Sequence, residues 1–180
     1  KIKEIKSALG NKFEILSLKD INCNEELPET QDTLEGNALQ KARYVSDNYN
    51  VNCFADDTGL IIASLNGEPG VYSARYAGEE KNAQKNIEKV LSKLKGENNR
   101  SAYFETVIAL IIDKEEYLFS GKAKGVITET LSGDKGFGYD PIFQPENLNR
   151  TFAELTMEEK NKISHRGKAF DKMCNFLLEQ

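Results

Sequence analysis

The sequence predicts an α/β fold with a mixed sheet, and three observations support it. Helical and strand-like apolar patterns alternate along the 180 residues. The segment 102–112 is long and rich in β-branched residues, which is typical of a strand near the centre of a sheet. No internal repeat, low-complexity tract or long linker divides the chain. We therefore expect a single domain over residues 1–180, with two lobes.

The first third of the chain alternates between helix and strand patterns. Ile2, Ile5 and Leu9 form a helical stripe, so a helix is expected over 1–9. A strand over 12–18, a polar loop over 20–34 and a helix over 35–48 follow. Two short strands, over 52–57 and 60–65, are expected to flank a turn with the sequence DDTG.

The remaining elements follow the same logic. A loop over 66–70 precedes an amphipathic helix over 84–95, which Gly96 ends. The central strand over 102–112 is followed by two more strands, over 117–120 and 125–130. A glycine-rich loop over 132–140 and a final helix over 164–178, capped by Ser164, complete the expected fold.

Composition narrows the functional class. The net charge of -5 argues against non-specific nucleic-acid binding. The three cysteines are widely spaced, which is typical neither of a disulfide framework nor of a zinc site and favours a reducing cytoplasm. No apolar run reaches about 18 residues, so no membrane span is expected. The chain opens on Lys1 inside a helical pattern, and we expect that a segment preceding it is missing.

Carboxylates mark the first candidate site. Asp56 and Asp57 are adjacent, and neighbouring side chains of a strand point to opposite faces, so the two are expected to differ in role. Glu29, in a polar loop, could join Asp57 in the small carboxylate set that Mg²⁺ prefers. A polar turn and an exposed loop acid are the alternative interpretations of these residues.

Two further segments indicate a ligand. Glycines alternate with aromatic residues in GFGYDP at 136–141, where glycine permits close backbone approach and an aromatic face can stack on a base. His165 and Arg166 follow Ser164 at a helix start, where basic groups and free N–H groups favour an anion. Lys1 and Lys41 have the pattern of solvated helix lysines. Together the groups indicate a nucleoside polyphosphate and metal-assisted phosphoryl chemistry.

The same segments resemble the inosine triphosphate pyrophosphatase family, and they occur in the family's order over nearly the whole chain. The matching motifs are PET at 28–30, EGNALQKA at 35–42, FADDTGL at 54–60, GEPGVYSARYAG at 67–78, GFGYDPIF at 136–143 and AELTMEEKNKISHRGKA at 153–169. The resemblance implies a long mixed sheet flanked by helices, two lobes with a deep cleft between them, and a homodimer. It also implies hydrolysis of non-canonical purine nucleoside triphosphates to monophosphate and pyrophosphate, with Mg²⁺.

The resemblance also implies roles for individual residues. Asp57 would bind the metal and act as the general base, and Glu29 would assist the metal. The implied substrate contacts are Thr58, Phe137, Gly138, Tyr139, Asp140, Lys160, His165 and Arg166. Family members begin with a strand and a phosphate loop of the form T-G-N-x-x-K, of which only the lysine remains here, as Lys1. Lys1 would therefore contact the phosphates.

Two other functions remain open at this point. A nucleotide-binding module without turnover would carry the same motifs. A phosphatase of the haloacid dehalogenase type is weakly similar through FADDTG, but its chemistry needs two aspartates two positions apart, and here they are adjacent.

Overall fold

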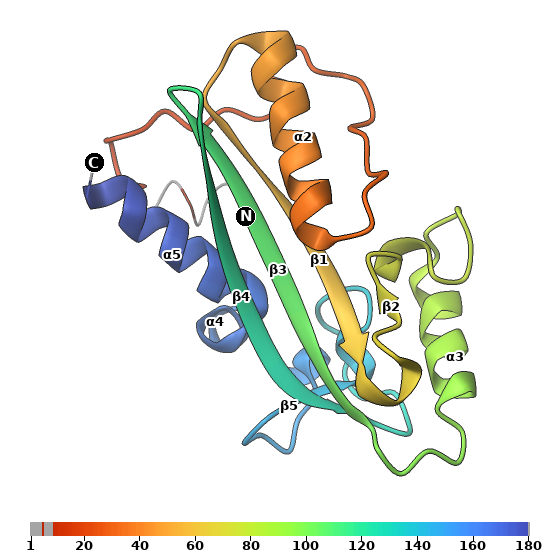
Figure 1. Cartoon of the computed structure of the whole chain (residues 1–180). Helices are drawn as coiled ribbons and strands as arrows, with labels where there is room; N and C mark the ends of the chain where they lie inside the picture. The colour runs from red at the N-terminus through yellow and green to blue at the C-terminus, as the bar shows by residue number, and fades with distance from the viewer. Residues whose placement is uncertain (1–4, 6–8, 180) are drawn as a thin grey trace. The chain divides into compact units, whose positions relative to one another are not determined.

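The structure, a computed structural model, describes residue 5 and residues 9–179 (Figure 1). The helix predicted over 1–9 and the predicted contact Lys1 lie mostly or wholly outside the described residues, although Ile5 and Leu9 are buried. The described helices and strands are, in order, α2 Leu34–Tyr49, β1 Cys53–Ile62, β2 Pro69–Gly70, α3 Ala83–Lys93, β3 Ser101–Ile112, β4 Glu115–Ile127, β5 Phe143–Pro145, α4 Met157–Ile163 and α5 His165–Glu179.

The described strands form an antiparallel sheet in the order β2-β1-β3-β4-β5. Leu60 of β1 lies opposite Gly70 of β2, and Gly125 of β4 lies opposite Pro145 of β5. The α/β class and the central position of β3 are confirmed. The parallel pairing that a mixed sheet needs is not among the described strands. The short connection from β3 to β4 can join only antiparallel neighbours.

Three strand predictions were wrong. The acidic motif is not a turn, because β1 runs without a break from Cys53 to Ile62. Likewise, β4 is one strand of 13 residues where two short strands were expected. The segment 12–18 does not pair with the sheet; its apolar side chains Phe13 and Ile15 pack against a core cluster instead. Burial alone therefore produced its strand-like pattern.

The chain divides into two compact units, and the prediction of a single domain stays a prediction. The first unit comprises residues 1–57, 107–120 and 169–180. Side chains of β3 point alternately to two cores of this unit. Val107, Ala109 and Ile111 pack with Ala38 and Ala42 of α2. Their neighbours Ile108 and Leu110 pack with Met173 and Leu177 of α5. The period of two along the strands thus assigns one face to each helix.

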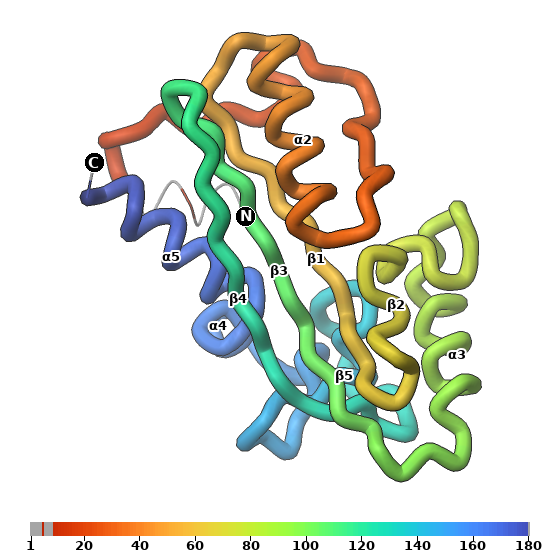
Figure 2. Tube along the Cα trace, in the orientation of Figure 1, coloured from red at the N-terminus to blue at the C-terminus, as the bar shows by residue number. Residues whose placement is uncertain are grey.

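The second unit comprises residues 58–106 and 121–168. Its core combines the apolar face of α3 with a group of aromatic side chains. Phe104 of β3 contacts Phe143 of β5 with ring centroids 4.7 Å apart. Figure 2 traces the chain through α3, β3, β4 and β5 in turn. None of the described helices is both long and apolar enough to cross a membrane.

Candidate functional site

An acidic cluster forms in the first unit around the side chain of Asp57. Residues 53, 55 and 57 of β1 share the face that α2 covers, and Cys53 and Ala55 pack against that helix. The Lys41 ammonium of α2 lies 2.7 Å from Glu29 Oε1 and 3.3 Å from Asp57 Oδ1. Both predicted metal ligands therefore contact one buried cation.

Two opposing effects act on the pKa of Asp57. Burial raises the pKa of this carboxyl group, whereas the charge of Lys41 and the hydrogen bond from Asn37 lower it. The net effect is a raised pKa. A carboxylate with a raised pKa is a stronger proton acceptor than an exposed one.

The donor set of the acidic cluster fits a hard divalent cation. No group of three or more His, Cys, Asp or Glu side chains suited to a metal occurs among the described residues. Mg²⁺ does not need such a group, because one or two carboxylates with water and substrate phosphate complete its octahedral shell. Glu29 and Asp57 both contact the Lys41 ammonium, so their carboxylates lie near one another and their remaining oxygen lone pairs could bind such an ion.

Asp56 faces the other way. It shares a strand face with Phe54, whose ring contacts Phe170 of α5 at 5.9 Å between centroids. The expected difference between the two aspartates follows from this alternation. Asp56 anchors no turn, because β1 runs through this position without a break.

A second cluster forms in the second unit around Phe137. This ring is 63% exposed, with the Lys160 ammonium 4.8 Å from its centroid and the Arg166 guanidinium carbon 5.4 Å from it. Lys160 is also bonded to the buried carboxylate of Asp140. An exposed aromatic face flanked by two cations suits a planar, electron-rich, anionic ligand.

The carboxylate of Asp140 holds the glycine-rich loop over 132–140 in place. This carboxylate accepts the N–H of Phe137 at 2.8 Å. Gly136 has a φ of +76°, and a side chain there would overlap Asp140 Oδ2. Tyr139 points inward and donates its hydroxyl to the carbonyl of Ser73 at 2.8 Å. Of the two aromatic residues, Phe137 is thus the one that presents its ring to solvent, and Tyr139 is a packing residue.

His165 differs from the expectation of a cation. It is 4% exposed and stacks on Phe104 with ring centroids 4.6 Å apart. Burial, together with the charges of Arg166, Lys160 and Lys168, lowers its pKa to about 3. His165 is therefore neutral near pH 7, and its Nδ1 has no hydrogen-bond partner among the described residues.

Ser164 caps α5, as predicted, and Arg166 lies in the first turn of that helix. The Ser164 hydroxyl caps α5 by accepting the N–H of Gly167 at 3.0 Å. Arg166 Nη2 lies 3.3 Å from the Thr58 hydroxyl, which in turn is 2.7 Å from the hydroxyl of Thr106. Thr58, Phe137, Asp140, Lys160 and Arg166 are thus linked within the second unit.

Sequence reasoning missed one residue of the acidic cluster and undervalued another. Asn37 and Lys41 both contact Asp57, yet Asn37 was not singled out and Lys41 was interpreted as solvated. The helix over 35–48 was predicted correctly, and residues four apart share a helix face. The spacing of Asn37 and Lys41 was therefore the available signal.

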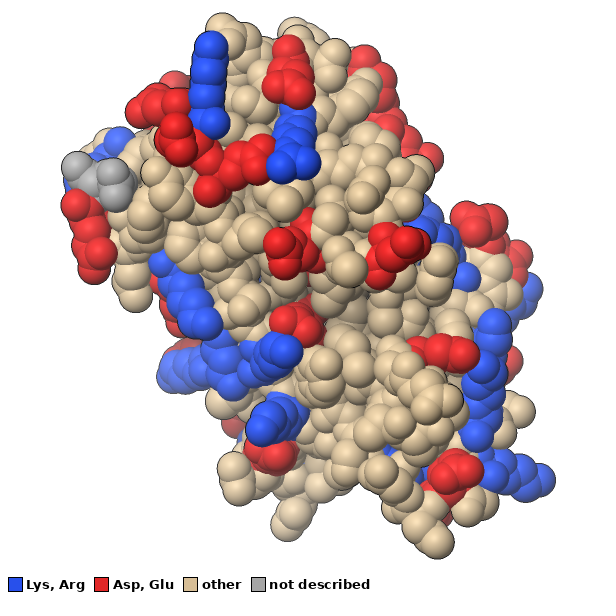
Figure 3. All heavy atoms as spheres, in the orientation of Figure 1, with Lys and Arg blue, Asp and Glu red and all other residues tan. Residues whose placement is uncertain are grey.

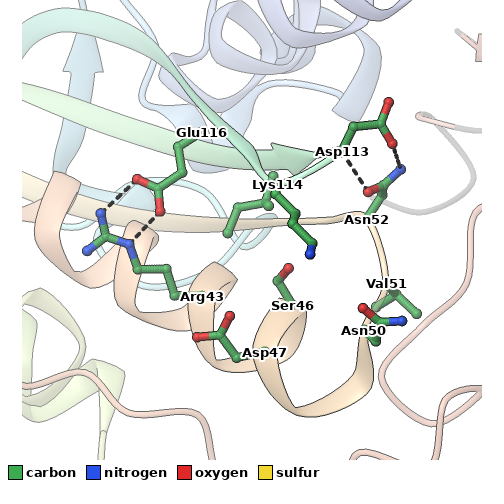
Figure 4. A pocket seen from close by; sticks show the side chains of 10 residues that line it. Arg43, Ser46, Asp47, Asn50, Val51, Asn52, Asp113, Lys114 and Glu116 are labelled. Atoms are coloured by element: carbon green, nitrogen blue, oxygen red, sulfur yellow. Dashed lines mark hydrogen bonds and ion pairs between the residues drawn. The ribbon is translucent and has the colours of Figure 1, made fainter.

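The first unit also contains a cavity of about 530 Å³ between α2 and the β3–β4 hairpin (Figure 4). Arg43 and Glu116 form a two-point ion pair at its wall, at 2.6 and 2.7 Å. Asn52 bonds Asp113, and Lys114 points toward the α2 side. None of the predicted site residues lines this cavity. Figure 3 shows that acidic and basic side chains are also interspersed over the face of the molecule drawn there.

The chain matches a known protein family. The sequence profile of the Ham1 family matches residues 1–176. The chain is 59% identical over 177 residues to a dITP/XTP pyrophosphatase of Flavobacterium johnsoniae, covering 98% of this chain and 92% of that relative. It is 48% identical over 181 residues to the dITP/XTP pyrophosphatase of Bacillus subtilis, covering 98% and 91%.

Solved structures agree with the sequence comparison. The structure of the Staphylococcus aureus Ham1 protein superposes with a TM-score of 0.93 at 39% identity, covering 99% of this chain and 93% of that one. A HAM1 protein from Coxiella burnetii gives a TM-score of 0.94 at 37% identity, with coverage of 99% and 93%.

Proposed function

Because this chain belongs to the Ham1 family, we propose that it hydrolyses the non-canonical purine nucleoside triphosphates ITP, dITP and XTP to the monophosphate and pyrophosphate. Relatives that share 45–59% of its sequence are named dITP/XTP pyrophosphatase. The observation that carries the proposal is the pair of carboxylates, Glu29 and Asp57, held on one buried cation. The activity would remove these nucleotides from the precursor pool.

Mg²⁺ is the metal that we assign to Glu29 and Asp57. When bound there, it would offset phosphate charge and lower the pKa of a bound water. The chain itself supplies the two carboxylate oxygens and keeps them partly shielded from water, with exposed side-chain fractions of 32% and 14%. Electrostatic contacts strengthen where water is excluded.

Asp57 is the catalytic residue of the proposal. It would accept a proton from the water that attacks the α-phosphorus, and the bond from that phosphorus to the bridging oxygen would break to release pyrophosphate. Its raised pKa suits this role, and the charge of Lys41 opposes the rise in pKa that burial causes.

The second cluster would bind the nucleotide. Phe137 offers its exposed ring to the purine, and Lys160 and Arg166 offer donors beside that ring. Gly138, Tyr139 and Asp140 shape the loop that holds Phe137, and Thr58 and His165 would complete the contacts to the substrate. Lys1 would contact the phosphates.

Selection against ATP would depend on the 6-position of the base. Hypoxanthine, xanthine and guanine carry a keto group there, whereas adenine carries an amino group. Guanine differs from hypoxanthine and xanthine by its 2-amino group, so selection against GTP would depend on the 2-position. Donors such as Lys160 and Arg166 can pair with the keto oxygen but would be left facing a donor of adenine. A buried polar group left without its partner makes such discrimination strong.

The remaining parts of the proposal concern the setting of the enzyme. We infer a homodimer in the cytoplasm, a small-molecule substrate, and no nucleic-acid or membrane partner. The three cysteines are free thiols, which supports a reducing compartment.

A product assay tests the proposed function. The protein is incubated with ITP, dITP, XTP, ATP or GTP, with and without Mg²⁺, and both pyrophosphate and orthophosphate are measured. We expect pyrophosphate from the first three substrates only, and only with the metal. Binding of ITP without product would indicate a nucleotide-binding module. Release of orthophosphate would indicate a phosphatase.

A further inference from the structure

Side chains of α2 hold three consecutive residues of the loop that carries Glu29. Lys41 binds the Glu29 carboxylate at 2.7 Å. The amide of Gln40 accepts the N–H of Thr30 at 2.9 Å, and that of Asn37 accepts the N–H of Gln31 at 2.9 Å. Positions 37, 40 and 41 share one face of a helix, so α2 fixes the register of this loop.

Asn37 differs from Gln40 because it also contacts Asp57. The backbone N–H of Gln31 can only donate, so the amide oxygen of Asn37 must face it. The amide nitrogen then faces Asp57 Oδ2, at 3.2 Å. Asn37 is 1% exposed, so water does not replace either bond easily. One buried amide thus joins the Glu29 loop to the Asp57 carboxylate.

We propose that Asn37 is a positioning residue, which sets the Glu29 loop and the Asp57 carboxylate in the arrangement needed to bind the metal and to accept the proton. This inference rests on the proposed function. Donation to Oδ2 fixes the plane of the carboxylate, while Lys41 holds Oδ1. Because Asn37 binds both partners, a shift of the loop and a rotation of Asp57 become coupled.

The alternative is that Asn37 only holds the loop for the sake of stability. Asn86 provides a matched control, since it is also the fourth residue of its helix and 4% exposed. Its amide holds a loop too, by accepting the N–H of Ala77 at 2.7 Å and donating to the carbonyl of Ala74 at 2.9 Å. Asn86 lies in the second unit, whereas Glu29 and Asp57 belong to the first.

The experiment compares wild type with Asn37→Leu, Asn37→Asp and Asn86→Leu. Leucine removes both amide bonds at similar volume. Aspartate keeps an acceptor for Gln31 but replaces the donor to Asp57 with a second carboxylate oxygen. Mn²⁺ binding without nucleotide is measured from the electron paramagnetic resonance signal of the free ion. Turnover of dITP at saturating Mg²⁺ and the thermal unfolding midpoint are measured in parallel.

We expect Asn37→Leu to raise the Mn²⁺ dissociation constant at least fivefold. Both Asn37 variants should lower kcat at least tenfold with KM for dITP within threefold, because Asn37 acts through Asp57 and not on the nucleotide. Asn86→Leu should leave the Mn²⁺ dissociation constant within twofold of wild type even where it lowers the unfolding midpoint.

Two results would overturn the inference. One is wild-type kcat in Asn37→Asp, which decides the matter even if Asn37→Leu does not fold. The other is a loss of Mn²⁺ affinity in Asn86→Leu equal to that in Asn37→Leu. Failure of the proposed function is distinguishable, because wild type would then bind Mn²⁺ but release no pyrophosphate, and the metal-binding comparison would still test Asn37.

Discussion

Asp57 is defined by its place on β1 and by two neighbours on α2. Strand alternation turns it toward α2, Lys41 compensates its charge, and Asn37 donates to it. Each contribution is ordinary in itself. Their combination holds a carboxylate in a partly buried place with a raised pKa but with a cation beside it.

Replacing Asp57 by Asn removes the proposed base at nearly constant shape. We expect kcat for dITP to fall about 10²- to 10⁴-fold, the usual contribution of a positioned acid or base. The unfolding midpoint should change little. Asp47→Asn, an exposed acid on α2, serves as the control and should keep wild-type turnover. Near-wild-type pyrophosphate release by Asp57→Asn would disprove the assigned role.

His165 should make stability depend on pH. Its pKa is about 3 in the folded protein and near 6.5 when unfolded, so the unfolded state binds a proton first as the pH falls. Stability is therefore lost as the pH drops from 6.5 toward 3, by about 2 kcal/mol at pH 5. His165→Phe, which keeps the stacking, should lack this contribution.

Urea unfolding of both proteins at pH 7.5 and pH 5 measures the effect. The wild type should lose more stability than His165→Phe between the two conditions. Equal losses would mean that His165 takes up its proton in the folded protein as readily as in the unfolded chain.

At the scale of elements, the junction of α4 and α5 places the two cations beside Phe137. Thr156 and Glu159 form a capping box that begins α4, and Ser164 begins α5. Lys160 and Arg166 come from the two helices on either side of this junction. The capped starts of α4 and α5 thus determine where Lys160 and Arg166 lie.

Gly167 is required for the close approach of these helices. A Cβ at this position would overlap the carbonyl oxygen of Asn161, and a backbone atom cannot move aside cheaply. We expect Gly167→Ala to lower the free energy of unfolding by about 1–3 kcal/mol, as for other overpacked sites. The KM for dITP should also rise, because Lys160 and Arg166 shift. Denaturant titration checks the first effect. An increase in stability, the usual result of glycine to alanine in a helix, would contradict the packing argument.

At the scale of the whole molecule, the two units carry clusters of different chemistry, acidic in the first and basic and aromatic in the second. Because the net charge of the protein is -5, it needs local cations to bind a polyphosphate. The described residues supply them as Lys41, Lys160 and Arg166.

Removal of divalent metal should stop turnover without unfolding the protein. With excess EDTA we expect no pyrophosphate from dITP and an unchanged circular dichroism spectrum, because the cores of both units contain only packed side chains. Excess Mg²⁺ should restore the rate. Full activity in EDTA would exclude the metal role of Glu29 and Asp57.

Much of the fold was predictable because its signals are local. The apolar faces of α2, α3 and α5 and the β-rich run of β3 follow from side-chain spacing within one segment. The errors share a cause as well. DDTG has the composition of a turn, but it lies within β1, and the pairing of β1 with β3 keeps it extended. The helix α4 was missed, although its capping box was visible.

The sequence by itself determined the α/β class, the family, and the residue types of the candidate site. Only the tertiary structure decided which of them meet and in which state. It showed Lys41 between two carboxylates, His165 neutral, Tyr139 buried and Asn37 bonded to Asp57. The physical reason is that burial and pairing depend on neighbours distant in sequence. A pattern records which side chain is present, whereas its charge and exposure are properties of the packed environment.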